Sequence, residues 1–347
     1  MLQELKTAMI ISHSIKCWLL ESSDPSMCYR TYVELLGMAA SEPEAVEARR
    51  AIPTSAAVQQ ILGRMHPEGY WEQRNPRTRA IIGDGVEYGS FATTHFCLSY
   101  LAHLGMNRQV GQVALAANRY LDLMQPDGDW YMHFSCLYGY NIQTFIMLGY
   151  RDDKRLQRSI KLLVDSARAD GGYLCDMHET KTGKCKVKSC IRGSLKALTA
   201  FCALGPEYWD HPSCKRLVGY FLDREGIYSK KDLQRPVNKD VQKMIFPFHW
   251  RSGLVEVLYT LSRMGYGMDS RLERAWRLLN TKVDRTGRYI LEWTPTQSSW
   301  KVGKRGHPNK WMTLYALLAM QAREESRGEY LEQYQPAVAG QLPTGRV

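Results

Sequence analysis

The sequence of 347 residues has no run of about twenty apolar residues, so it offers no segment that would cross a membrane as a helix. The apolar residues 9–11 are followed by Ser12, His13 and Lys16, and this patch is too short and too polar for a signal peptide. A serine nucleophile elbow, a P-loop and a dinucleotide-binding glycine motif are also missing. We therefore expect a cytoplasmic globular protein outside these three enzyme classes.

Cysteine usage is unlike that of a secreted disulfide framework. The chain has nine cysteines, an odd number, and they are unevenly spread, with a cluster in residues 175–190. This distribution favours reduced thiols or a bound metal, and hence a reducing compartment. With 44% hydrophobic residues the chain can bury a large core, and its length alone permits one large domain or two smaller ones.

The chain is basic, with a formal net charge of +11. Lysine and arginine are dense in residues 181–192, 216–243 and 301–310. Basic surface can bind nucleic acid, an anionic membrane or a phosphorylated substrate, or it can be a solvated face without a specific partner. Because no zinc-finger, RRM or helix-turn-helix signature accompanies the charge, nucleic acid ranks last. Peripheral membrane contact stays open.

A short turn recurs along the chain, in which an acidic or polar residue, glycine, any residue and an aromatic residue follow one another. It occurs in residues 66–71, 125–130, 168–173, 223–228 and 284–289. Between these turns lie apolar segments that end at Gly105, Gly149, Gly205 and Gly265, where glycine supplies the left-handed conformation of a helix C-cap. A basic amphipathic segment follows each cap. The repeating unit is therefore a turn, an apolar helix, a glycine and an amphipathic helix.

Alternation of these two kinds of helix predicts layers. A helix that is apolar on most faces must be surrounded, whereas one with a single apolar stripe lies outside. We predict an all-α fold, an α/α toroid (barrel) of about six inner and six outer helices, with a flat solenoid as the alternative. One domain would cover residues 1–330, and residues 331–347 would form a frayed tail. The predicted inner helices are residues 26–36, 88–104, 134–148, 189–204, 246–264 and 307–320.

The turn Gln125-Pro126-Asp127-Gly128-Asp129-Trp130 resembles the QW-type motif of the squalene-cyclase and protein-prenyltransferase repeat superfamily. The resemblance extends over residues 26–320 in the order and rhythm of the repeating units, and includes the prenyltransferase-like repeat proteins of bacteria and archaea. It implies an α/α barrel and an isoprenoid substrate. Fold alone does not fix the reaction, because toroids carry unrelated activities.

The motifs that carry chemistry in this superfamily are only partly present. The resemblance places Cys190 where prenyltransferases have a zinc-binding cysteine, but Lys188 stands at the position of the accompanying aspartate. Residues 310–312, Lys-Trp-Met, stand where a Tyr-His pair would supply the zinc histidine. The Asp-x-Asp-Asp acid cluster and the Asp-Asp-x-x-Asp magnesium motif of terpene cyclases are absent. A standard prenyltransferase or cyclase site is therefore not reproduced.

In a toroid, the loops that enter the inner helices meet at one end of the central cavity. The residues at these starts are polar, basic or aromatic where a core would hold leucine, which favours a ligand cavity over simple helix capping. The candidate catalytic residues are His133, Tyr138, His249 and Trp250. The candidate substrate-binding residues are Lys188, Arg192, Arg251 and Lys310 for an anionic group and Tyr140, Phe246 and Trp311 for an apolar body. Aromatic residues at helical spacing also serve as plain core.

A zinc site is the first specific expectation. Cys175, His178, Cys185 and Cys190 lie at spacings that a loop could wrap into a tetrahedron, and Cys136 on the preceding inner helix could replace His178 or Cys185. The alternative is that the loop residues are exposed and Cys190 is a small buried hydrophobe. We expect an enzyme acting on a prenyl or other apolar, diphosphate-bearing substrate. The alternative is a non-catalytic toroid with a structural zinc and a basic partner-binding face.

Overall fold

The computed structural model describes residues 11–74, 78, 80–82, 85–86, 91–131, 133–176 and 188–333, with side chains up to residue 326. The chain is mostly helical in these residues. The elements in chain order are α1 His13–Leu19, α2 Pro25–Arg30, η1 Thr31–Leu35, α3 Pro43–Ala51, η2 Ile52–Thr54, α4 Ala56–Leu62, β1 Gln73–Arg74, β2 Ile81–Ile82, α5 Thr94–His103, α6 Gly111–Asp122, α7 Ser135–Met147, α8 Lys154–Asp165, α10 Ile191–Leu204, α11 Pro206–Trp209, α12 Pro212–Leu222, β3 Tyr228–Ser229, β4 Asp232–Pro236, α13 Leu254–Arg263, η3 Ser270–Leu272, α14 Glu273–Asn280 and α15 Lys310–Gln333.

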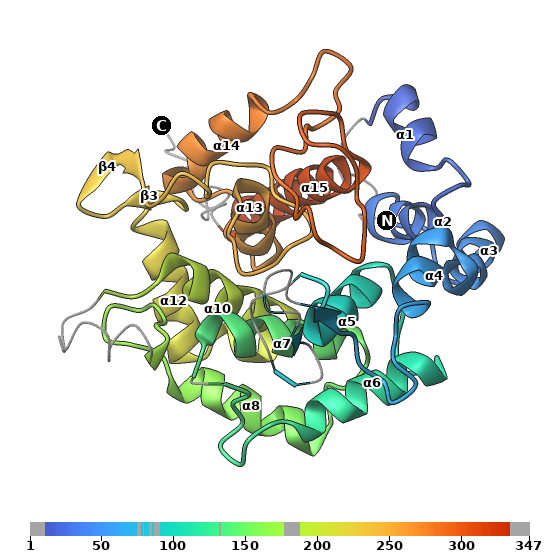
Figure 1. Cartoon of the computed structure of the whole chain (residues 1–347). Coiled ribbons are helices and arrows are strands. Elements are labelled where there is room, and N and C mark those ends of the chain that lie inside the picture. Colours follow the sequence, from blue (N-terminus) through green and yellow to red (C-terminus); the bar gives the residue numbers. More distant parts are fainter. Residues whose placement is uncertain are drawn as a thin grey trace, which may run out of the picture.

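The helices fall into an inner and an outer group that alternate along the chain (Figure 1). The inner helices α5, α7, α10, α13 and α15 pack consecutively against one another, and α15 also contacts η1. The outer helices α6, α8, α12 and α14 each pack on an inner helix. Burial follows the predicted pattern: α5 is buried at every position, whereas α6 buries a single stripe that includes Val113, Ala117 and Tyr120.

The aromatic residue of the repeated turn ties two layers together. The side chains of Trp71, Trp130 and Tyr173 each donate a hydrogen bond to the backbone carbonyl ten residues earlier, at 2.7, 3.1 and 2.7 Å. That carbonyl lies at or near the end of the preceding outer helix. In the other direction, the backbone N–H of Tyr173 donates to the hydroxyl of Ser194 on α10 at 2.9 Å. Trp71 and Tyr289 make the same bond to a threonine of the following inner helix. The sequence repeat is thus a repeat of contacts.

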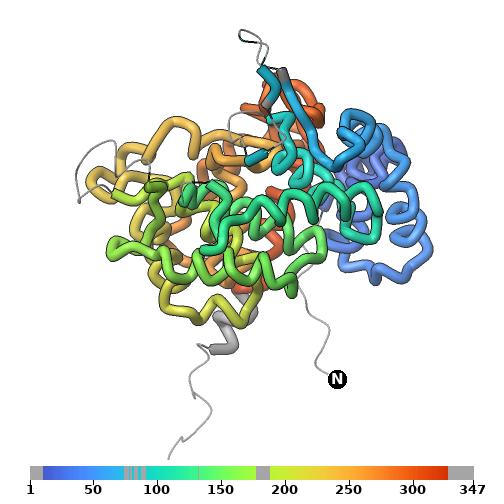
Figure 2. The backbone as a smooth tube through the Cα atoms, turned by 60° about the horizontal axis from the view of Figure 1, so that its bottom comes forward, coloured from blue at the N-terminus to red at the C-terminus, as the bar shows by residue number. Residues whose placement is uncertain are grey.

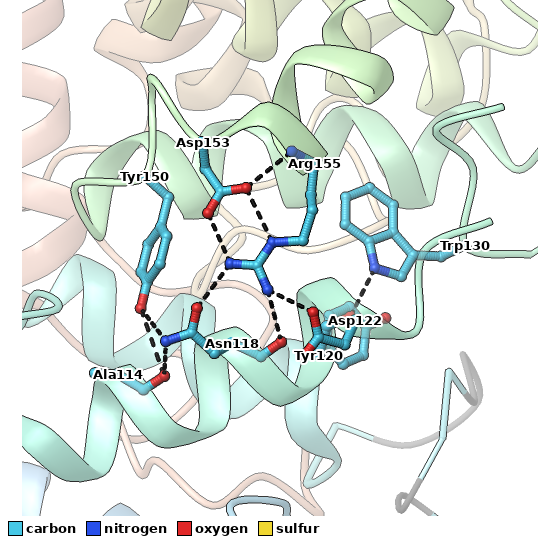
Figure 3. Close-up of polar contacts among 8 residues, drawn as sticks. All are labelled: Ala114, Asn118, Tyr120, Asp122, Trp130, Tyr150, Asp153 and Arg155. Atoms are coloured by element: carbon cyan, nitrogen blue, oxygen red, sulfur yellow. Dashed lines mark hydrogen bonds and ion pairs between the residues drawn. The ribbon is translucent and has the colours of Figure 1, made fainter. Parts of the chain in front are cut away.

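Neighbouring outer helices are joined by an arginine network (Figure 3). Arg155 of α8 donates to both carboxylate oxygens of Asp153 at 2.9 and 2.7 Å, which fixes the guanidinium plane. It also donates to Asp122 at 2.5 Å and to the side-chain oxygen of Asn118 at 2.7 Å, both on α6. This bidentate, charge-assisted geometry sets the spacing of α6 and α8.

Two predicted inner helices begin later than the sequence indicated. The predicted helix 88–104 is α5, which begins at Thr94, and residues 87–90 lie outside the described part of the chain. The predicted helix 246–264 is α13, which begins only at Leu254. Pro247 accounts for the second error, because proline lacks a donor and disfavours a helical conformation at the residue before it. Residues 244–253 instead form an irregular segment that runs into the interior.

Other boundaries were close, and the described residues are mostly helical, as predicted. The N-terminal inner segment is α2 continued by the wider π-helical turn η1. Two small antiparallel sheets, β1–β2 and β3–β4, accompany the helices. Helix α15 runs through Gln333, beyond the predicted domain boundary, and residues 334–347 lie outside the described residues. None of the described helices is long and apolar enough to cross a membrane.

The segments that precede inner helices gather at one end of the molecule. The strands β1 and β2, which precede α5, lie beside the segment that precedes α15 (Figure 2), and Gln73 hydrogen-bonds Gln297 at 3.2 Å. We call this end the mouth.

Candidate functional site

At the mouth, aromatic rings from three different segments lie in contact. Phe91, which precedes α5, lies 5.0 Å from the ring of His249 and 6.0 Å from that of Trp293. His249 and Trp293 are 4.8 Å apart, and Trp250 stacks at 6.2 Å on Phe91. His249 is fully buried, whereas Phe91, Trp250 and Trp293 are half-buried, so this aromatic surface reaches from the interior to solvent.

Two arginines lie over this surface. The guanidinium carbons of Arg192, at the start of α10, and of Arg251 are each 5.0 Å from the ring centroid of Trp250. Arg251 also lies 4.8 Å from that of Trp293. Both guanidinium groups are about one-third exposed. The mouth cluster is the set Phe91, Arg192, His249, Trp250, Arg251 and Trp293.

One buried carboxylate holds the cations of the mouth in place. Asp240 accepts hydrogen bonds from Arg251 at 2.8 Å, from Arg192 at 3.2 Å and from Lys243 at 3.1 Å. Burial raises the pKa of Asp240, but the bond from Lys243 and the charges of Arg251, Lys243 and Arg192 hold it below its ordinary value. Three cations around one carboxylate leave an excess of positive charge, which suits an anionic ligand. A surface hollow of about 390 Å³ lies next to Lys243 and is also lined by Glu292, Arg305 and Gly306.

Farther inside, the inner helices carry a buried ion pair. Lys196 of α10 donates to Oε1 of Glu256 on α13, and the two side chains are 0% and 1% exposed. Neither residue was among the predicted site residues. The available signal was a charged residue in an otherwise apolar stretch, in residues 193–201 and 254–261. The ring of Tyr140, from α7, lies 5.9 Å from the Lys196 ammonium.

The imidazole of His249, the buried member of the mouth cluster, responds to the charge of this ion pair. Its Nδ1 accepts the backbone N–H of Arg251 at 3.0 Å, so the neutral ring carries its proton on Nε2. Burial lowers the pKa of His249 well below the ordinary value, and the charges of Lys196, Arg251 and Arg192 lower it further. The ring is therefore a neutral donor at Nε2. That atom is buried and has no hydrogen-bond partner among the described residues.

Aromatic side chains fill the interior beside the ion pair. Phe246 stacks on Trp311 at 5.2 Å and meets Trp300 at 5.4 Å, while Phe248 lies 4.6 Å from Tyr315. All five are buried. Phe246 and Trp311, predicted to bind an apolar substrate body, thus belong to one packed cluster of rings.

The cysteines form a pair across two segments. Sγ of Cys175 lies 3.8 Å from Sγ of Cys136 on α7 and 3.7 Å from the hydroxyl of Ser135. The bond from Cys136 lowers the pKa of Cys175 to about 6, aided by the Ser135 hydroxyl and by the backbone N–H groups of both residues. A helix N-terminus favours an anion in this way. Cys190 donates its backbone N–H to Tyr173, and within the described residues no group of three His, Cys, Asp or Glu side chains is arranged to hold a metal ion. His178 and Cys185 lie outside the described part.

The remaining predicted site residues occupy separate places. His133 is bonded by Asp176 at 2.7 Å and by Asp127 at 2.9 Å, and these carboxylates raise the pKa of its imidazole. Tyr138 is buried on α7 beside Tyr173 and Cys175. Burial raises the pKa of its hydroxyl group, and the charges of Tyr173 and Cys175 raise it further.

Two of the predicted anion-binding lysines lie away from the mouth cluster. Lys310 pairs with Glu21 at 2.8 Å, next to Trp18 of α1. Lys188 is exposed. Desolvation lowers the pKa of its ammonium group, and the positive charges of the nearby Lys231 and Arg224 lower it further. Arg192 and Arg251 are therefore the predicted cations that the structure brings together.

Comparison with known proteins gives a likeness in structure and none in sequence. No protein-family model and no curated protein matches the chain. A glycosyl hydrolase of family 88 from Bacteroides vulgatus has a similar structure, with a TM-score of 0.50, 15% identity, and coverage of 88% of this chain and 91% of that one. A polysaccharide lyase has a TM-score of 0.49 at 16% identity, covering 89% and 90%. The type II terpene cyclase MstE from Scytonema has a TM-score of 0.31 at 13% identity, covering 80% and 98%. The first of these likenesses shows that the helical layers of this chain follow a fold known from an enzyme of unrelated sequence.

Proposed function

We propose that this protein is an enzyme of the α/α-toroid class that binds a substrate with an anionic head and an apolar body, of the prenyl diphosphate kind, at the mouth. The alternation of inner and outer helices supports the toroid, as does the fold likeness to the family 88 glycosyl hydrolase. The resemblance of the repeated turns to those of cyclases and prenyltransferases supports the substrate class.

The observation that carries the proposal is the convergence of Arg192 and Arg251 on Trp250. Guanidinium groups bind diphosphates through paired hydrogen bonds, and the rings below them offer an apolar surface that also attracts a developing cation. Asp240 orients both arginines without neutralising them, since Lys243 shares the same carboxylate. A surface hollow lined by Lys243 and Arg305, together with Glu292, lies next to this set of cations.

Titration calorimetry with farnesyl diphosphate tests this site. The wild-type protein should bind farnesyl diphosphate more tightly than inorganic pyrophosphate or farnesol, because each of these lacks half of the recognised features. Arg251→Met should weaken the binding by about tenfold or more, the loss of one charge-assisted contact. Arg271→Met is the matched control, because Arg271 is exposed on the outer layer and pairs with Asp269.

A uronic acid disaccharide is the comparison ligand, because arginine and tryptophan also bind sugar carboxylates and sugar rings. Preference for the disaccharide would contradict the prenyl class. The absence of binding to every ligand in the set would contradict the substrate site as a whole.

We also propose a zinc ion held by Cys175 and Cys136, with Cys190, His178 and Cys185 as the choices for the remaining ligands. Two sulfurs at the usual Zn–S distance in a tetrahedron are about 3.8 Å apart, which fits the observed 3.8 Å between these thiols. The lowered pKa of Cys175 fits a thiolate ligand. A bound zinc would activate a water or thiol or polarise a carbonyl group if one position stays open, and would only fix the loop if all four positions are protein ligands.

Metal analysis of protein purified without a histidine tag tests the zinc. About one zinc per chain is expected, and Cys136→Ser and Cys175→Ser should each lose most of it. Cys17→Ser is the control, because Cys17 is an exposed residue of α1. Wild-type protein without zinc would contradict the metal. Zinc with four protein ligands, together with no ligand binding at the mouth, would favour the non-catalytic toroid and its partner-binding face.

A further inference from the structure

The ion pair of Lys196 and Glu256 is poorly explained as a stabilising contact. Both side chains are almost fully buried, and the desolvation of two charges offsets most of their attraction. A pair of apolar side chains would join α10 and α13 at least as well. A fully buried ion pair that contributes little to stability is therefore a candidate for a role in chemistry or recognition.

The pair is also incompletely satisfied. Lys196 occupies only Oε1 of Glu256, and Oε2 is buried without a hydrogen-bond partner in the described residues. The Nε2 atom of His249 is also buried without a hydrogen-bond partner in the described residues. Buried polar atoms nearly always have partners, because an unmade hydrogen bond leaves the atom without water and without compensation. The Oε2 atom of Glu256 is therefore an acceptor that a ligand or a transferred proton could occupy, and the Nε2 atom of His249 is a donor that a ligand could occupy.

His249 belongs to the mouth cluster and also responds to the charge of Lys196. Residues 249–251 place Arg251 and Trp250 at the surface and His249 in the interior, close enough to Lys196 for its charge to affect the imidazole. For Glu256 to meet a substrate whose anionic head lies at Arg192 and Arg251, the apolar body of that substrate must pass His249.

The charged and titratable groups around the pair come from each packed element. The charge of Glu256 raises the pKa of Tyr140 on α7 and of Tyr315 on α15. Lys196 has charge interactions with His103 on α5, Cys136 on α7 and His249. Burial raises the pKa of Glu256 and lowers the pKa of Lys196. His103 is neutral, because burial lowers the pKa of its imidazole to about 4.

We propose that Glu256 is the catalytic acid–base residue of this enzyme, transferring a proton through Oε2, and that Lys196 is the positioning residue that holds its carboxylate. This inference rests on the proposed function. When Glu256 gives its proton to a substrate atom, the O–H bond breaks and its electrons stay on the carboxylate, which the Lys196 ammonium stabilises. When the carboxylate takes a proton from a substrate atom, the bond from that atom to hydrogen breaks and leaves its electron pair on the substrate, while the O–H bond forms at Oε2.

The experiment compares turnover and binding of farnesyl diphosphate in three glutamate variants. Glu256→Gln keeps the shape but cannot transfer a proton, so kcat should fall by about 10²–10⁴-fold while Kd stays within about threefold. Its pH–rate profile should lose one limb. Glu256→Asp keeps the carboxylate but withdraws it by one carbon, so an intermediate kcat is expected. Glu34→Gln is the matched control, since both oxygens of Glu34 are already bonded to Arg30 at 2.6 Å.

The outcomes separate this inference from the proposed function. If the wild type neither binds nor converts farnesyl diphosphate, the proposed function fails and the inference falls with it. If the wild type turns over and Glu256→Gln retains a similar kcat, only the inference is overturned. Equal losses of kcat and binding in Glu256→Gln and Glu34→Gln would also overturn it, because they indicate a structural role. If Glu256→Gln does not fold, an unchanged kcat in Glu256→Asp overturns the inference and a fall of about tenfold at constant Kd supports it.

Discussion

The ion pairs of Arg155 and of Lys196 each join two neighbouring helices, and they are built differently. In the outer layer, Arg155 bonds Asp153, Asp122 and Asn118, so every part of its guanidinium group has a partner (Figure 3). In the inner layer, Lys196 meets Glu256 through a single oxygen, and the second oxygen has none in the described residues. The outer network is partly exposed to solvent, with the Arg155 side chain 24% exposed, whereas both side chains of the inner pair are buried.

The difference separates stability from function. A solvated, fully bonded arginine gains more from its contacts than it loses in desolvation. A buried ion pair with an unpaired acceptor contributes little to stability, because the desolvation of both charges offsets their attraction. Such a pair is expected where a substrate supplies the missing hydrogen bond. We therefore expect substitutions in the outer network to change unfolding only. Substitutions in the centre should change the chemistry and, when they leave one charge alone, the stability as well.

The largest effect is expected from leaving Glu256 without its partner. Lys196→Met should lower the free energy of unfolding by about 3–5 kcal/mol, because it strands a buried carboxylate in an apolar interior. Urea unfolding followed by circular dichroism measures this. A loss below about 1 kcal/mol would place the pair in a solvated setting and would remove the contrast with Arg155.

A smaller effect is expected in the outer layer. Arg155→Met should cost about 1–2 kcal/mol of unfolding free energy, since it removes several charge-assisted bonds that are partly exposed. The Kd for farnesyl diphosphate should not change. A clear loss of ligand binding in this variant would mean that the spacing of α6 and α8 affects ligand binding at the mouth. It would contradict the expectation that the outer network contributes to stability alone.

The smallest effect concerns His133 at the half-exposed turn before α7. Its bonds to Asp176 and Asp127 raise the folded pKa above the ordinary value near 6.5, so the stabilisation is present below about pH 6.5 and is lost as the pH rises through the folded pKa. His133→Asn, which tolerates the positive φ of 45°, should cost about 0.5 kcal/mol at pH 6 and less at pH 8.5. Urea unfolding at both values measures it, and a larger cost at pH 8.5 would contradict the assignment.

The sequence predicted the repeating unit well because glycine and aromatic residues have local consequences. Gly128 and Gly171 adopt φ values of 92° and 83°, and a Cβ on Gly128 would meet the backbone of Arg158 at 2.4 Å. Such positions are readable from residue type alone. Helix starts were less predictable, since Pro247 and the irregular segment 244–253 depend on how the interior is filled.

The candidate site was only partly predictable, because contacts between distant segments have no local signature. Arg192 and Arg251 were expected at one end, but Asp240, which holds both, lies in a stretch without a motif. Cys136 was only an alternative ligand in the sequence, whereas the structure places its sulfur next to Cys175. Lys196 is a single charged residue in an apolar helix, and the sequence alone does not show its partner. The buried ion pair with Glu256 becomes visible only in the structure.

The measurement that tests the central claim most directly is the stability of the double variant Lys196→Met/Glu256→Leu, which replaces the ion pair by apolar groups of similar size. If the pair is kept for chemistry, the double variant should unfold at the same or a higher urea concentration than the wild type, while its turnover of farnesyl diphosphate is lost. A double variant destabilised as strongly as Lys196→Met would contradict the account, because the ion pair would then be part of what holds the inner helices together.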